Sequence, residues 1–182
     1  MLTGLATRIP EKRNIVTIFA VAMFLVYTWT LFISFWKLPS WLFFLRLGEI
    51  VSIYAYAFLV NFFESILLLL LVLLPAMLLP RHWWKDVFIP KAFVLILVIL
   101  GSAVIHMTLY RTPDTRGIFV SAQINWWLGT LGIAIVLTWL AGKVAWLRRG
   151  LENVADRFVV FLYIYLPLTV LALFIVLARI FL

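Results

Sequence analysis

Residues 15–36 read IVTIFAVAMFLVYTWTLFISFW and contain no charged side chain. A membrane-spanning helix needs about 20 consecutive apolar residues, because the hydrocarbon core of a bilayer is about 30 Å thick. The run is longer than the roughly 7–15 apolar residues of a signal peptide. The sequence therefore predicts a retained first membrane span over residues 15–36.

The composition of the whole chain extends this interpretation. Of the 182 residues 66% are hydrophobic and 12% are charged, whereas about 25% of the residues of an ordinary soluble domain are charged. This excludes a soluble enzyme and a disordered chain. Further apolar runs occupy residues 50–79, 92–110, 118–141 and 158–178. The predicted fold is an all-α integral membrane protein, a single membrane domain over residues 1–182 that forms a bundle of five transmembrane helices.

Turn-forming residues divide the runs. Pro39 disfavours helix at Leu38, so the sequence predicts a turn over residues 36–41 and an interfacial segment over residues 41–49. The second run has no Gly or Pro between residues 60 and 65, which favours one long helix over two short ones. A basic interfacial segment is predicted over residues 143–157, with a break at Gly150.

The basic residues predict the orientation, because Lys and Arg collect in cytoplasmic loops. The net charge is +8, and this rule accounts for it without a nucleic-acid partner. With five spans, ten of the fifteen Lys and Arg residues fall on one side: Arg8, Lys12, Arg13, Arg81, Lys85, Lys91, Lys143, Arg148, Arg149 and Arg157. Five fall on the other: Lys37, Arg46, Arg111, Arg116 and Arg179. We expect a multi-pass protein of the plasma (inner) membrane with a cytoplasmic N-terminus and an extracytoplasmic C-terminus.

Polar residues inside the spans define the candidate site. Glu64 is the one acid within a predicted span, and an intramembrane acid tends to face the interior of a bundle. Counting residues along the spans places Glu64 and His106 in the outer half of the membrane, and we expect their side chains to approach within hydrogen-bond or water-bridged reach. The predicted polar or ligand cluster is Asn61, Glu64, His106, Gln123 and Asn125. It either holds the helices in register or binds a ligand, an ion or a lipid headgroup.

Helical spacing gives each of these spans a polar face. Ser102 and His106 are four residues apart on the third span. On the fourth, Asn125, Gly129 and Gly132 share a face, and the two glycines predict close helix packing. We expect these faces to point towards other helices rather than lipid.

No catalytic motif is present. The chain has no Cys and two His, and those two fall at opposite ends of the membrane on the predicted topology, so no metal, haem or other cofactor is expected. The nine Trp residues fall mostly near span ends and predict an aromatic, tryptophan-rich interface. Anionic lipid headgroups are the predicted contacts of Lys143, Arg148, Arg149 and Arg157.

Three functions fit these features. The first is a non-catalytic membrane subunit or scaffold that packs with membrane lipids, other membrane proteins or copies of itself. The second is a small transporter or channel component that uses the cluster around Glu64. The layout of five spans also resembles the membrane part of lipoteichoic-acid-synthase-like enzymes, whose extracellular metal-dependent domain follows the fifth span. That resemblance implies a third function, the membrane anchor module of such an enzyme without its catalytic domain.

Overall fold

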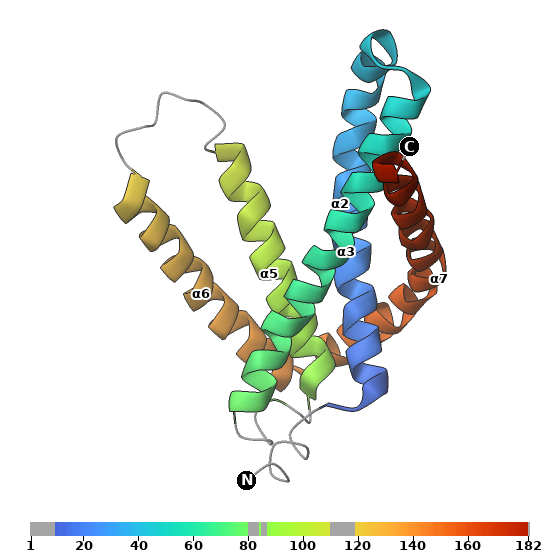
Figure 1. Cartoon of the computed structure of the whole chain (residues 1–182). Helices are drawn as coiled ribbons and strands as arrows, with labels where there is room; N and C mark the ends of the chain where they lie inside the picture. Colours follow the sequence, from blue (N-terminus) through green and yellow to red (C-terminus); the bar gives the residue numbers. More distant parts are fainter. Residues whose placement is uncertain (1–9, 80–83, 85–86, 110–118, 182) are drawn as a thin grey trace. The chain divides into compact units, whose positions relative to one another are not determined.

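The computed structural model describes residues 10–79, 84, 87–109 and 119–181. Within these ranges the chain is all-helical, and five helices are long and apolar enough to cross a membrane (Figure 1). They are α2 (Lys12–Phe44), α3 (Leu47–Leu78), α5 (Phe88–Leu109), α6 (Phe119–Lys143) and α7 (Ala145–Phe181). The prediction of an all-α chain with five such helices is therefore confirmed.

The helices group into two compact units. Glu11–Leu73 and Val154–Leu182 form the α2–α3–α7 unit, and Leu74–Asn153 contains the α5–α6 unit. The boundary between them falls inside two helices, near the end of α3 and near the start of α7. A single membrane domain remains a prediction.

Helix α2 does not stop where the sequence predicts. The turn expected over residues 36–41 is wrong, because α2 continues through Pro39 to Phe44. Proline removes one backbone donor, but apolar helices tolerate this loss, and here it falls near the helix end. Pro39 is exposed, so its ring meets little packed structure.

The reversal between α2 and α3 is short and capped. Leu45 ends α2 by donating its N–H to the carbonyl of Trp41 over 2.8 Å. The Arg46 N–H donates to Oε2 of Glu49, also over 2.8 Å, which is one half of a capping box at the start of a helix. Residues 41–49 are therefore the end of one long helix, a tight turn and the start of the next. α3 then runs unbroken through residues 60–65, as the absence of Gly and Pro there predicts.

The break predicted at Gly150 is also wrong. α6 ends at Lys143 and α7 begins at Ala145, and Gly150 lies within α7. Helical hydrogen bonds even continue across the junction, from Val144 N–H to the Leu140 carbonyl and from Arg148 N–H to the Val144 carbonyl. A single glycine costs a helix only about 1 kcal/mol relative to alanine, which neighbouring helical turns readily outweigh.

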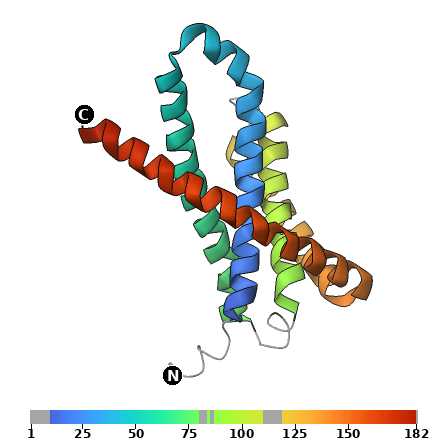
Figure 2. The same ribbon diagram turned by 90° about the vertical axis from the view of Figure 1, so that its right-hand side faces the viewer.

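The core of the α2–α3–α7 unit is built around Tyr27. In this unit α7 crosses the α2–α3 hairpin obliquely (Figure 2). Tyr27 is fully buried in a cluster with Ala20, Met23, Leu162 and Tyr165. Its ring stacks on Phe58, with centroids 5.5 Å apart, and on Tyr165 at 4.7 Å. One tyrosine of α2 therefore contacts both α3 and α7.

In the α5–α6 unit the two helices pack side by side. They lie closest where α5 begins and α6 ends, and they diverge towards the end of α5 and the start of α6 (Figure 1). A Cβ atom at Gly142 would stand 2.5 Å from Cε of Lys91, so the stem of the lysine lies directly across the glycine. Because this atom belongs to the far end of a flexible side chain, a larger residue at Gly142 would displace the Lys91 side chain rather than separate the helices.

Candidate functional site

The five residues of the predicted cluster fall into both units. Asn61 and Glu64 lie on α3 in the α2–α3–α7 unit, whereas His106, Gln123 and Asn125 belong to the α5–α6 unit. Polar pairs form within each unit. The Thr30 hydroxyl donates to Oδ1 of Asn61 over 3.0 Å, and Nε2 of His106 is 2.8 Å from Oε1 of Gln123. The approach of Glu64 to His106 remains a prediction.

Further contacts join α5 and α6 next to the His106–Gln123 pair. They involve Ser102 and His106 of α5 and Trp126 and Thr130 of α6, and we call them the polar seam. The Trp126 indole N–H donates to the Ser102 hydroxyl over 2.9 Å. Ser102 and Thr130 Oγ atoms are 2.6 Å apart, and the His106 ring meets the Trp126 ring edge-on at 5.3 Å. Ser102 and His106 thus form the predicted polar face of α5, and that face points towards α6.

The face of α6 that meets them differs from the predicted one. Gln123, Trp126 and Thr130, at helical spacing, make the contacts with α5. Asn125 and Gly129 lie at the edge of that face, where they help to line a pocket of about 450 Å³ between the two helices. The Asn125 side chain is exposed and has no hydrogen-bond partner in the described part of the chain.

The glycines do not have their predicted role. Within the part of the chain that the structure describes, nothing lies within 4 Å of a Cβ built at Gly129 or Gly132. Gly129 therefore faces the pocket rather than a packed helix, because α6 is rotated so that Trp126 and Thr130 make the contacts with α5. Among the described glycines, Gly142 is the one whose Cβ would meet a neighbouring side chain, that of Lys91.

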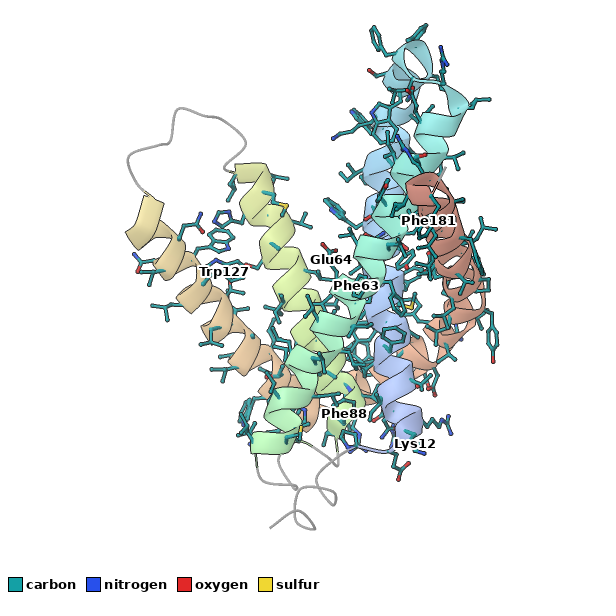
Figure 3. The ribbon with its side chains drawn as sticks, in the orientation of Figure 1. Lys12, Phe63, Glu64, Phe88, Trp127 and Phe181 are labelled. Atoms are coloured by element: carbon teal, nitrogen blue, oxygen red, sulfur yellow. The ribbon has the colours of Figure 1, made fainter. Side chains whose placement is uncertain are left out.

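Glu64 lies on an exposed, apolar face of α3 (Figure 3). Its neighbours on that face are also exposed, with Val60 at 54%, Phe63 at 63% and Leu67 at 63%. Within the described ranges, Glu64 makes no ion pair or hydrogen bond. One turn earlier, Asn61 is buried, and its Nδ2 atom also has no partner in the described part. The two residues share a helix but have opposite environments.

A second polar network joins the three helices of the other unit. The Tyr27 hydroxyl donates to the Phe58 carbonyl over 2.9 Å and lies 2.6 Å from Oγ1 of Thr169. Thr169 Oγ1 also lies 2.7 Å from the Tyr165 carbonyl, so its single proton goes either to that carbonyl or to the Tyr27 oxygen. Sequence analysis missed Thr169, although Tyr165 and Thr169 are four residues apart and share one face of the last apolar run.

The basic residues around the α6–α7 junction are exposed. Lys143 Nζ lies 4.2 Å from the centroid of the Trp139 ring, a cation–π distance, and Arg148 pairs with Glu152 at 3.0 Å. Arg13 lies 3.6 Å from Asp156, and 81% of the Arg13 side chain is exposed, so this pair adds little stability. Contacts of Lys143, Arg148, Arg149 and Arg157 with lipid headgroups remain a prediction.

Comparison with known proteins gives no relative for this arrangement. No protein-family model, curated protein or solved structure matches the chain.

Proposed function

We propose that the chain is a multi-pass protein of the plasma (inner) membrane that acts as a non-catalytic subunit and packs against other membrane proteins or lipids. Five apolar helices among the described residues support a multi-pass membrane protein. The charge rule supports a cytoplasmic N-terminus and an extracytoplasmic C-terminus, since ten of fifteen basic residues then face the cytoplasm.

The environment of Glu64 carries this proposal. An acid in the hydrocarbon region is rare and is normally paired or faces protein, because exposing its charge to lipid costs several kcal/mol. Glu64 stands on an exposed face among Val60, Phe63 and Leu67. Such a face suits a neighbouring membrane protein that offers a hydrogen-bond donor to Glu64 and apolar side chains to the rest.

The other polar side chains favour a structural role over a transport pathway. Tyr27, Ser102 and Trp126 each donate or share hydrogen bonds with a neighbouring helix. Hydrogen bonds between helices in a membrane are worth about 0.6 kcal/mol on average, which is enough to fix the register of a hairpin. Groups that are already paired in this way are less available to coordinate a passing ion.

Assembly in mild detergent tests the proposal. Native mass spectrometry of the tagged chain should show a stoichiometric membrane partner or a second copy. Glu64→Gln should keep the complex, because the amide keeps the hydrogen-bonding capacity. Glu64→Arg should reduce the bound fraction by about tenfold or more, since a charge of the wrong sign at an interface costs several kcal/mol. Ser40→Arg, at an exposed site outside the predicted spans, should have no effect.

The opposite result identifies the transporter alternative. A chain that is always monomeric, and whose Glu64→Gln variant folds but loses a proton- or cation-dependent flux in reconstituted vesicles, would contradict the subunit proposal. It would assign Glu64 to a transport pathway instead.

A further inference from the structure

We propose that a pocket between α2 and α3, lined by Lys37, binds the phosphate of an anionic membrane lipid. This inference rests on the membrane placement proposed above. It concerns a region outside the predicted polar cluster, and it names a chemical class of ligand that the proposed function leaves open.

The pocket has a volume of about 220 Å³ and lies within the α2–α3 hairpin. Its polar and aromatic lining residues are Trp29, Thr30, Ser34, Lys37, Trp41 and Tyr54. The residues from α2 recur at intervals of three and four, so they lie along one face of the helix. One helix thus presents an ammonium group, two hydroxyl groups and two indole rings to the same space.

The hydroxyl protons of the lining are already used inside the protein. Thr30 donates to Asn61, and the Ser34 hydroxyl donates to the carbonyl of Leu31 over 2.8 Å. The Tyr54 hydroxyl donates to Ser34 Oγ over 3.1 Å. These three side chains therefore fix the wall of the pocket and have no proton left for a ligand.

The N–H donors of the lining are still free, although the hydroxyl oxygens can also accept. Lys37 carries up to three N–H donors and no acceptor, and each indole carries one N–H donor. Within the described residues, neither Lys37 nor the indole N–H groups of Trp29 and Trp41 have an acceptor. The ammonium group and the two indole N–H groups together suit a ligand group that accepts several hydrogen bonds, such as a phosphate or a carboxylate.

The charge of the pocket selects an anion. No Asp or Glu is among the lining residues, and Lys37 makes no ion pair in the part of the chain that the structure describes. A cation without a counter-charge in a small pocket attracts an anion from outside. Lys37 is exposed, so an anion would bind at the open mouth of the pocket, where a hydrogen bond to a charged group is still stronger than one between neutral groups.

Position and shape favour a lipid as the carrier of that anion. Lys37 follows directly after the predicted span 15–36, and Trp36 and Trp41 flank it, as is typical of the headgroup level of a bilayer. The remaining lining is aliphatic, with Ile33 on α2 and Ile53 on α3. A phosphodiester at Lys37 can therefore continue into glycerol and acyl groups along apolar walls, whereas free phosphate would leave those walls uncovered.

Lipid titration followed by native mass spectrometry tests the site. The full chain in detergent should bind phosphatidylglycerol more tightly than phosphatidylcholine of the same acyl chains. Lys37→Gln should raise the dissociation constant for phosphatidylglycerol about tenfold, as expected for the loss of a hydrogen bond to a charged group. Lys37→Arg should restore binding. Arg46→Gln should leave it unchanged, because Arg46 is an exposed cation of the same hairpin outside the pocket.

A second variant and a set of contradicting outcomes complete this test. If Lys37→Gln does not fold, Trp41→Phe removes one indole donor while keeping an aromatic ring, and should raise the dissociation constant about fivefold, the value of one ordinary hydrogen bond. Three outcomes would overturn the lipid assignment: an equal loss of phosphatidylglycerol affinity in Lys37→Gln and Arg46→Gln, equal affinity for the two lipids, or displacement of the lipid by millimolar inorganic phosphate.

Carbonate extraction of membranes distinguishes failure of the lipid site from failure of the proposed function. A chain that stays in the membrane but fails these tests lacks the lipid site, whereas a chain that is extracted also contradicts the proposed function.

Discussion

Replacing Tyr27 by Ala is expected to lower the free energy of unfolding of the α2–α3–α7 unit by about 3–5 kcal/mol, the usual cost of removing a buried aromatic side chain. Tyr27 is fully buried, and its ring stacks on Phe58 and Tyr165. Its hydroxyl also bonds both α3 and α7. Loss of this side chain therefore removes contacts between all three helices at once.

Unfolding in mixed micelles with increasing dodecyl sulfate, followed by circular dichroism, measures this effect. Tyr27→Phe should cost about 1 kcal/mol, because it removes the hydrogen bonds but keeps the ring. Tyr163→Ala is the matched control on α7, since its side chain is 79% exposed. If Tyr27→Ala and Tyr163→Ala had equal free energies of unfolding, the packing of Tyr27 between the three helices would be contradicted.

Trp126→Ala is expected to have the second largest effect, about 2 kcal/mol, in the α5–α6 unit. The side chain is half-buried, so the cost should be about half of that for a fully buried aromatic residue. Its indole donates to Ser102 and its ring packs edge-on against His106. The substitution therefore leaves the seam between α5 and α6 without its central donor.

The next residue supplies the control. Trp127 is 48% exposed, so Trp127→Ala should change the free energy of unfolding by about 0.5 kcal/mol or less. The same dodecyl sulfate titration compares the two variants. A larger loss for Trp127→Ala than for Trp126→Ala would mean that α6 is rotated relative to the arrangement described above.

The helical fold follows from the sequence, but the ends of the helices do not. Long uncharged runs such as residues 15–36 predict each helix, because hydrophobicity over about 20 residues is a strong signal. Pro39 and Gly150 were misleading because they express local preferences of a few kcal/mol or less. Near a helix end, or between well-formed turns, these preferences do not stop the helix.

The candidate site was predictable in part. The spacing of Ser102 and His106 correctly indicates a polar face directed at another helix, and the polar pair with Gln123 follows from that face. The rotation of α6 is set by the packing of whole helices, so the partners Trp126 and Thr130 could not be derived from spacing alone. Gly129 was misassigned for the same reason, since a small residue faces either a close helix or an open pocket.

The position of the helices relative to the membrane is the central claim, and cysteine labelling tests it most directly. The chain has no Cys, so single cysteines report without background. Ser40 and Arg149 are exposed sites on α2 and α7. The proposed topology places Ser40 on the extracytoplasmic side of the membrane and Arg149 on the cytoplasmic side. An impermeant thiol reagent added to intact cells should label Ser40→Cys and should label Arg149→Cys only after permeabilisation. Labelling of Arg149→Cys in intact cells, with protection of Ser40→Cys, would contradict the proposed orientation.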